Sequence, residues 1–285
     1  MFDTHCHLNF SAFDGILEDV IFEAKNEGVE KFVVPGTDVE TSKKAVEIAK
    51  KYEEIFAAVG IHPHHIYEVK SQKAKVKSYN LKLKINKLIE EIENLLKEEK
   101  VVAIGEIGLD RHIYKKTKYK DYKIDEEFIA LQKEVFLAQL DLVKKYKKTV
   151  ILHNREAKDD LLKILNTCYL IINTSMVFHC CEPDFDLLDF AKKNHIYIGV
   201  DGDVTYNPKK QAFVKEIPLP LLVLETDSPF LTPAPLRNDQ KTKFPNNPKN
   251  LILVAQKVAE IKEEKVEKIM KITKENGERL FKIIK

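Results

Sequence analysis

The chain has 285 residues, a length that suits either two ordinary domains or one large α/β barrel. With 44% hydrophobic and 32% charged residues it has the composition of a globular protein, which excludes a disordered or low-complexity chain. Its formal net charge of +2 favours no particular partner, although the cations are unequal: 43 Lys and only 4 Arg.

Eight short apolar runs rich in β-branched residues predict strands. In chain order they are Met1–His5, Lys31–Gly36, Ile55–Gly60, Val101–Glu106, Thr149–His153, Met176–His179, Ile196–Val200 and Leu221–Thr226. Amphipathic segments between and after them predict helices: Ile16–Glu27, Glu40–Tyr52, Lys87–Lys97, Glu126–Tyr146, Lys158–Leu165, Phe185–Lys193 and Asn250–Lys282. This alternation favours a parallel sheet closed into a (β/α)₈ TIM barrel. No Pro, Gly or Ser-rich linker divides the chain, so residues 1–285 are expected to form one domain.

Three segments are longer than the connections of such a barrel require. They are Val69–Asn86, Arg111–Ile124 and Ala234–Lys249. Each follows the C-terminal end of a predicted strand, so we expect basic loop insertions on the C-terminal rim, where active sites of this fold are built. The second segment also carries Tyr114, Tyr119 and Tyr122. Its lysines and tyrosines either contact nucleic acid or belong to a solvated insertion in a Lys-rich chain.

Ligand-type side chains gather where the predicted strands end. His5 and His7 form an H-x-H at the first strand, and the two-residue period of a strand points both imidazoles to the same side. Further residues of this type close later strands or follow them closely: His62, Glu106, His153, His179 and Asp227. Crowded together without a cation, these groups would compete for too few hydrogen-bond partners, so the pattern predicts a metal site.

The number of ligands predicts two divalent ions. Six candidate ligands, without His62, exceed the three protein ligands typical of a catalytic zinc. A carboxylate such as Glu106 can bridge two ions, an arrangement suited to displacement at phosphorus by a water held between them. Nitrogen and oxygen ligands together do not decide among Mg, Mn and Zn.

Six motifs along the chain resemble those of a known family. They are Asp3–Leu8 (DTHCHL), Gly60–His64 (GIHPH), Gly105–Asp110 (GEIGLD), His153–Ala157 (HNREA), Phe178–Cys180 (FHC) and Glu225–Leu231 (ETDSPFL). Together they are similar to the TatD-type metal-dependent deoxyribonucleases, which belong to the amidohydrolase-like barrels. The resemblance implies a TIM barrel with a divalent-metal centre that hydrolyses phosphodiester bonds of DNA, and it assigns metal ligation to the same six positions.

The resemblance also suggests how those ligands divide. One ion would be held by His5, His7 and Asp227, and the second by His153 and His179, with Glu106 bridging the two. Asp227 would in addition accept the proton of the attacking water.

Three further residues are candidates for substrate contact. His62 either contacts the scissile phosphate or leaving group or has a structural role. Arg155 lies two residues after His153, so it either binds a phosphate oxygen or forms an ion pair with Glu225. Arg237 lies in a loop that resembles an arginine-bearing segment of the family.

One motif departs from the family pattern. Where the family usually continues His-Cys/Ser-Phe-Ser-Gly, this chain reads His179-Cys180-Cys181-Glu182-Pro183. Glu182 is expected to repel a phosphate at that place, which puts the substrate preference in question. Cys181 is either an extra soft ligand or a buried thiol.

Three functions are compatible with these observations. The first is a nuclease acting on DNA, on single strands or at ends. The second is an amidohydrolase-like barrel that hydrolyses a small ester, lactone or amide, which the Lys-rich rim disfavours. The third is a metal-bound, catalytically weak protein that binds nucleic acid, and only the Cys181-Glu182-Pro183 turn supports it.

The sequence carries no basic leader and no apolar run long enough for a signal peptide or membrane span, so a cytoplasmic protein without a membrane partner is expected. Its four cysteines show no CxxC pair and are expected to stay reduced. The sequence does not predict an oligomeric state.

Overall fold

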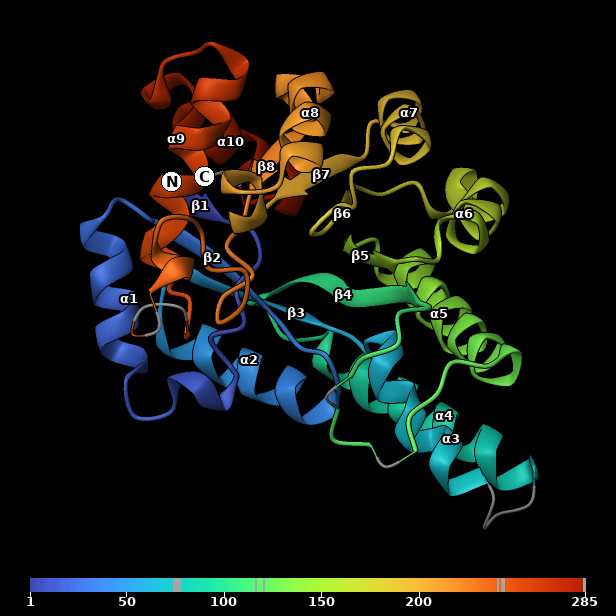
Figure 1. The fold of residues 1–285 in the computed structure, drawn as a ribbon. Coiled ribbons are helices and arrows are strands. Elements are labelled where there is room, and N and C mark those ends of the chain that lie inside the picture. The colour runs from blue at the N-terminus through green and yellow to red at the C-terminus, as the bar shows by residue number, and fades with distance from the viewer. Residues whose placement is uncertain (74–77, 116, 120, 240, 242–243, 284–285) are drawn as a thin grey trace.

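The computed structural model describes residues 1–73, 78–115, 117–119, 121–239, 241 and 244–283 (Figure 1). Five lysines of the basic segments therefore lie outside the described residues: Lys75, Lys77, Lys116, Lys120 and Lys243.

Eight parallel strands form one sheet in the order of the sequence. They are β1 (Phe2–Asp3), β2 (Lys31–Pro35), β3 (Ile55–Val59), β4 (Val101–Asp110), β5 (Thr149–Arg155), β6 (Met176–Phe178), β7 (Tyr197–Val200) and β8 (Leu222–Leu224). The amide of Thr4 donates to Leu224 O at 3.1 Å and the amide of Asp227 to His5 O at 2.9 Å, which joins the first strand to the last. The sheet thus curls into a barrel, and the predicted TIM barrel is confirmed.

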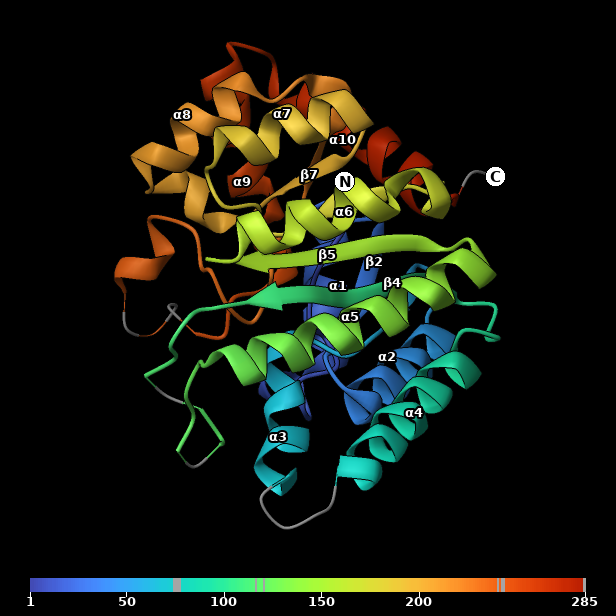
Figure 2. The same ribbon diagram turned by 90° about the vertical axis from the view of Figure 1, so that its right-hand side faces the viewer.

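Helices surround the barrel (Figures 1 and 2). They are α1 (Leu17–Asn26), α2 (Val39–Lys51), α3 (Tyr67–Lys73), α4 (Ser78–Leu95), α5 (Glu126–Tyr146), α6 (Lys158–Ile172), α7 (Phe185–Asn194), α8 (Pro208–Glu216), α9 (Leu251–Lys262) and α10 (Val266–Phe281). Parallel strands need such crossover connections, and the helices bury the outer face of the sheet.

Two sequence predictions about these segments are wrong. The expected loop Val69–Asn86 contains the end of α3 and the first half of α4, whose inner side buries Ile85 and Ile92. The expected single helix Asn250–Lys282 is two helices, because the chain turns at Glu263, which adopts a left-handed conformation with φ of 54°.

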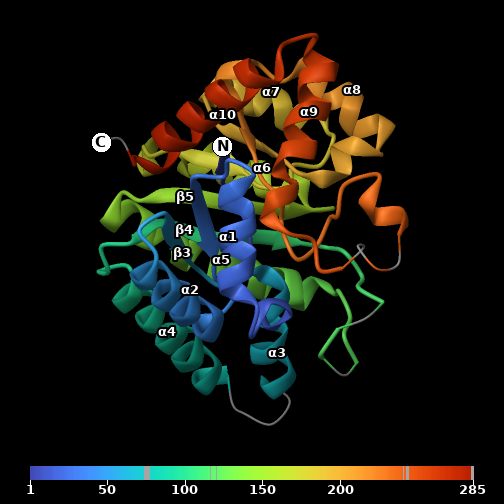
Figure 3. The same cartoon turned by 90° about the vertical axis from the view of Figure 1, so that its left-hand side faces the viewer.

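Side chains fill the barrel and close its N-terminal end. Residues from seven strands form a buried cluster with the last turn of α10: Phe2, Val33, Ala58, Ala103, Ile151, Val177, Val223, Leu280 and Phe281. The rings of Phe2 and Phe281 lie 5.9 Å apart, and Figures 1 and 3 both place the N-terminus beside α10. Because α10 covers this end, only the C-terminal end of the barrel is left for a site.

Two buried glutamines of α5 hold the backbone at that C-terminal end. Gln139 Oε1 accepts from the amide of Ile61 at 2.7 Å, and its Nε2 donates to Ile61 O at 3.1 Å. Gln132 makes the same paired contact with the backbone of Asp110, at 2.9 Å in both directions. Ile61 directly precedes His62, so the two amides fix the backbone at two positions of the rim.

None of the helices in the described part of the chain is both long and apolar enough to cross a membrane.

Replacing Gln139 with Leu is expected to destabilise the protein. The substitution leaves the buried amide and carbonyl of Ile61 without partners, and each unpaired group costs about 1–3 kcal/mol. We expect chemical denaturation to show a loss of roughly 2–5 kcal/mol in the free energy of unfolding. Glu134→Leu, on the exposed face of the same helix, is the control. Equal stability of the two variants would contradict this account of Gln139.

Candidate metal centre

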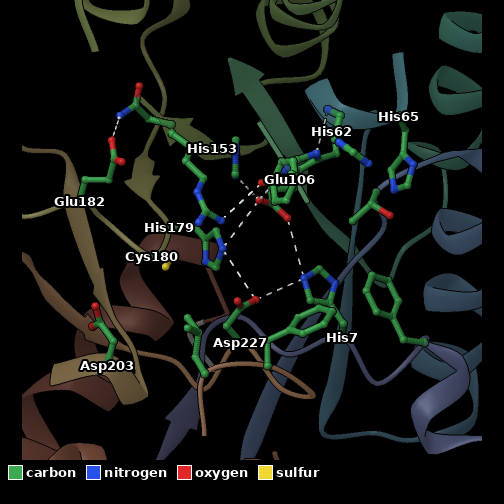
Figure 4. A pocket seen from close by; sticks show the side chains of 18 of the residues that line it. His7, His62, His65, Glu106, His153, His179, Cys180, Glu182, Asp203 and Asp227 are labelled. Atoms are coloured by element: carbon green, nitrogen blue, oxygen red, sulfur yellow. Dashed lines mark hydrogen bonds and ion pairs between the residues drawn. The ribbon is translucent and has the colours of Figure 1, made fainter. Parts of the chain in front are cut away.

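The C-terminal end of the barrel holds a hollow of about 650 Å³. Five of the six predicted ligands line it, namely His7, Glu106, His153, His179 and Asp227, and so do His62, Arg155 and Glu182. His5 is fully buried and lies next to His7 and His179. Figure 4 shows the labelled imidazoles and Asp227 arranged around the Glu106 carboxylate. The structure therefore brings together residues that the sequence separates by more than 200 positions.

The first group of donors follows the ends of β1 and β8 and includes Glu106 of β4. The Nε2 atoms of His5 and His7 lie 3.2 Å apart. Asp227 Oδ1 lies 3.7 Å from His5 Nε2 and 3.4 Å from His7 Nε2. Glu106 Oε2 faces the same two nitrogens, at 3.6 and 3.9 Å. Four donor atoms thus converge on one small volume.

The second group surrounds the other oxygen of Glu106. Its Oε1 lies 2.7 Å from His153 Nδ1, 3.4 Å from His62 Nε2 and 3.7 Å from His179 Nε2. His179 Nε2 is also 3.8 Å from Asp227 Oδ1, which connects the two groups. The carboxylate of Glu106 therefore stands between two sets of imidazoles, with one oxygen toward each.

These residues fit divalent cations. Two imidazole nitrogens that face each other at 3.2 Å, as in His5 and His7, can share at most one proton between them, whereas a cation accepts both lone pairs. Nitrogen and carboxylate oxygen are donors suited to Zn and Mn, and carboxylate oxygen also to Mg. The cluster is therefore a candidate metal centre whose donor atoms already lie close together.

Burial and neighbouring charges shift the pKa values of the carboxylates in opposite directions. Burial alone would raise the pKa of Glu106, but the imidazoles of His62 and His179 outweigh it and hold the pKa well below its usual value. Burial would likewise raise the pKa of Asp110, yet the hydrogen bond with His153 lowers it to about 2. Both carboxylates are therefore charged at neutral pH.

The partner imidazoles shift in the opposite direction. Burial would lower the pKa of His153, but the hydrogen bonds with Asp110 and Glu106 raise it to about 9. Burial opposes protonation of His179 as well, and the charges of Glu225 and Glu106 raise its pKa to about 10. In the absence of cations these two imidazoles are protonated at neutral pH.

Asp110 is a residue of this site that the sequence interpretation did not select. The strand β4 was expected to end at Glu106 but continues to Asp110. The buried Asp110 Oδ2 lies 3.0 Å from His153 Nε2 and accepts a hydrogen bond from the Tyr114 hydroxyl at 2.8 Å. Its position four residues after Glu106 on the same strand was the available signal.

Glu225 also belongs to the site. The alternative prediction that it forms an ion pair with Arg155 is wrong. Its Oε1 lies 3.1 Å from His179 Nδ1 and accepts from the amide of Cys180 at 2.5 Å. A carboxylate on the far nitrogen of an imidazole fixes the orientation of that ring. Arg155 does not pair with Glu225 but lies beside Tyr114, with its guanidinium carbon 5.2 Å from the ring centroid.

The two candidate arginines lie in different places. Arg155 lines the hollow that contains the imidazoles. Arg237 lines a neighbouring hollow instead, where its guanidinium carbon lies 3.4 Å from the ring centroid of Tyr206. The structure thus brings Arg155, and not Arg237, to the ligand cluster.

The turn Cys181-Glu182-Pro183, which departs from the family pattern, is stabilised by hydrogen bonds within the protein. Glu182 accepts from Asn154 Nδ2 at 2.9 Å and from the amide of Glu156 at 3.1 Å, and burial raises the pKa of its carboxyl group. Cys181 is buried in the hydrophobic core and does not line the hollow, which agrees with a buried thiol.

The tyrosines of Arg111–Ile124 pack against neighbouring rings. Tyr119 and Tyr122 lie 5.3 and 4.8 Å from His64, measured between ring centroids. The Tyr119 hydroxyl lies 2.9 Å from His65 Nδ1. Of the three tyrosines only Tyr114 lines the hollow.

Metal binding by this cluster has a thermal signature. An ion at about 100 times its dissociation constant adds about 2.7 kcal/mol to stability, so Mn, Zn or Mg is expected to raise the Tm by roughly 5–10 °C. Glu106→Ala should remove most of this shift, because it deletes the carboxylate between the two imidazole sets. Glu182→Gln, a change in the same hollow outside the cluster, should keep it. Native mass spectrometry should count two ions in the unaltered protein, and a cluster that binds none would contradict the assignment.

Cation uptake is expected to release protons. His153 and His179 are protonated at neutral pH, and an imidazole must lose its proton before that nitrogen binds a metal. As the pH rises toward the pKa values of about 9 and about 10, the competition from protons weakens and the apparent metal affinity increases. Calorimetry at pH 7 in buffers of different ionisation enthalpy should measure up to about two protons released per protein. An affinity that does not change with pH would count against these ligands.

Comparison with known proteins places the chain in one family. The model of the TatD related DNases matches residues 2–282. The chain is 38% identical over 285 residues to the uncharacterized metal-dependent hydrolase YabD of Bacillus subtilis, with 99% of each chain covered. It is 28% identical over 287 residues to the 3'-5' ssDNA/RNA exonuclease TatD of Edwardsiella piscicida, covering 99% of this chain and 100% of that one.

A solved structure agrees with this placement. The TatD homologue YjjV from Escherichia coli superposes with a TM-score of 0.80 at 28% identity, over 100% of this chain and 98% of that one. The protein therefore belongs to the TatD family and is a metal-dependent hydrolase.

Proposed function

We propose that the protein is a divalent-metal-dependent nuclease that cleaves phosphodiester bonds of DNA, on single strands or at ends. The observation that carries this proposal is the position of Glu106, whose two oxygens face two separate sets of imidazoles. A bridging carboxylate between two ions is the arrangement used for in-line displacement at phosphorus. The relative named a 3'-5' ssDNA/RNA exonuclease supports a nucleic-acid substrate.

The chain's own residues would hold two ions. The first would lie among His5, His7 and Asp227, and the second between His153 and His179, with Glu106 shared. Bound there, the ions supply a water of lowered pKa and neutralise charge on the phosphate oxygens. The donor set is compatible with Mg, Mn and Zn, and we leave the choice to elemental analysis.

Asp227 is the proposed acceptor of the proton from the attacking water. Its carboxylate lines the hollow, and Oδ1 lies within 3.4 to 3.8 Å of three imidazole nitrogens. The turn that carries it is fixed, because the amide of Asp227 donates to His5 O at 2.9 Å. A general base has to be held this firmly beside the water it deprotonates.

His62 is proposed to donate a hydrogen bond to the scissile phosphate or to the leaving oxygen. Its Nδ1 accepts from the amide of His64 at 3.1 Å, so in the neutral ring the proton is on Nε2. Burial and the charge of His153 lower the pKa of His62, which keeps the ring neutral at pH 7. Nε2 faces Glu106 and the hollow, where a substrate oxygen would lie.

Arg155 is proposed to bind a phosphate oxygen beside the ions. Its side chain lines the hollow next to Tyr114, and its Nη1 lies 3.4 Å from the Tyr114 hydroxyl. A guanidinium can direct two parallel N–H groups at a phosphate, which an ammonium cannot do.

Labelled single- and double-stranded DNA, incubated with the protein and Mg, Mn or Zn, tests this function. We expect metal-dependent cleavage that Glu106→Ala reduces about 100-fold or more. Substituting residues that only hydrogen-bond to metal ligands already lowers activity about 10- to 100-fold. Arg155→Lys should raise the KM more than it lowers kcat, and Glu182→Gln is the control within the hollow. No cleavage with any metal, or equal cleavage by Glu106→Ala, would refute the nuclease. Hydrolysis of p-nitrophenyl acetate in place of DNA would support the small-ester hydrolase instead.

A further inference from the structure

Large aromatic rings are exposed on one side of the metal centre. Phe230 is 45% exposed and Phe244 57%, although a chain buries such rings when it can. Both line a second hollow of about 370 Å³, together with Tyr206 and Arg237. This hollow shares Phe230 and Leu231 with the main one, so the two are adjacent.

A series of rings leads from the candidate ligands to this second hollow. His7 stacks on Phe10 with ring centroids 4.4 Å apart and an angle of 17° between the planes. Phe230 lies 6.1 Å from Phe10 and 6.4 Å from His7. Phe230 thus lies 6.4 Å from a proposed metal ligand, measured between ring centroids.

On the other wall of the second hollow, the Arg237 guanidinium lies on the ring of Tyr206. The guanidinium carbon of Arg237 lies 3.4 Å from the centroid of the Tyr206 ring. This contact holds the guanidinium in place and leaves a cation beside an apolar ring, a combination that suits a phosphate next to a base.

The hollow is built on a fixed backbone. The amide of Phe230 donates to Asp227 O at 2.9 Å, and the amide of Ala234 donates to Thr205 Oγ1 at 2.8 Å. Gly202 allows a close approach to Leu231 O that any side chain there would prevent. The loop after β8 is therefore attached to the segment that carries Tyr206, and binding would not require the hollow to form anew.

The tyrosines on the opposite rim do not offer the same surface. Tyr119 and Tyr122 pack on His64 and Tyr67. Among the aromatic residues that the structure describes, Phe230 lines both hollows and is 45% exposed.

Resting on the nuclease function proposed above, we propose that Phe230, Tyr206 and Arg237 form a nucleobase subsite next to the metal centre. The base of a nucleotide adjacent to the scissile phosphate stacks on Phe230, and Arg237 binds the phosphate of that nucleotide. Every base has a π face, so stacking of this kind tolerates any sequence. The occupant is a planar base with its phosphate, and a second copy of the chain or an apolar peptide is an alternative that the test excludes.

The test combines changes in the protein with changes in the base. In a labelled oligonucleotide, thymine is replaced by 5,6-dihydrothymine at each position around the first scissile bond in turn. The saturated ring keeps the hydrogen-bonding groups of thymine but is not flat, so it weakens stacking alone. The enzyme is compared with Phe230→Leu, Phe230→Trp and the control Phe22→Leu, which changes an exposed ring on α1.

We expect one position to be sensitive. There, dihydrothymine should lower kcat/KM of the unaltered enzyme about 5- to 150-fold, the loss that corresponds to 1–3 kcal/mol of base stacking. Phe230→Leu should show a similar loss with thymine and almost no further loss with dihydrothymine, while Phe230→Trp should restore the discrimination. Phe22→Leu should behave like the unaltered enzyme. The metal-induced Tm shift of Phe230→Leu should be unchanged, which excludes damage to Asp227.

Two kinds of failure are distinguishable. Suppose that the unaltered enzyme cleaves DNA and that Phe230→Leu discriminates between thymine and dihydrothymine as strongly as the unaltered enzyme. The subsite is then refuted, and the nuclease function stands. If no DNA is cleaved with any metal, both proposals fall. A change of oligomeric state in Phe230→Leu without a change in base discrimination would assign the exposed rings to an interface between copies.

Discussion

The buried charge of Glu106 is the interaction on which the rest of the site depends. Its side chain is only 4% exposed, and an isolated carboxylate at such a place would take up a proton. Imidazoles on both sides prevent this, and each oxygen faces a different set of them. Because the charge cannot move to water, His153 and His179 either stay protonated or exchange their protons for cations. The metal centre proposed above is the second of these solutions.

The barrel explains how such a cluster forms from distant parts of the sequence. Parallel strands end at the same rim, and contacts between first and last strand bring His5 beside Asp227. The opposite end is filled by α10, so water reaches the interior from one side. Ligands that end strands therefore meet at the bottom of a hollow, where a low dielectric strengthens every charge interaction.

The sequence predicted the part of this arrangement that depends on periodicity. The eight apolar runs and the residues that close them are local patterns, so the strand count and the gathering of His5, Glu106 and His179 could be expected. The helix α8 could not, because its inner face carries Lys210, a cation that donates to Cys181 O at 2.7 Å and lies 3.3 Å from Asp201. In a sequence pattern a lysine predicts an exposed position. Only the fold shows the buried carboxylate of Asp201 that balances its charge.

Contacts between loops explain the remaining differences. Asp110 contacts His153, and Glu225 contacts His179. Both contacts depend on how neighbouring strands align, which the sequence of one segment does not determine. The aromatic residues illustrate the same limit, since a Tyr-rich segment suggested base stacking while its rings pack on the protein. Which ring is available to a ligand is decided by what covers it, and coverage is a property of neighbours distant in sequence. Phe230 is exposed on a turn that is fixed at Asp227, whose amide donates to His5 O and whose carbonyl accepts from the amide of Phe230.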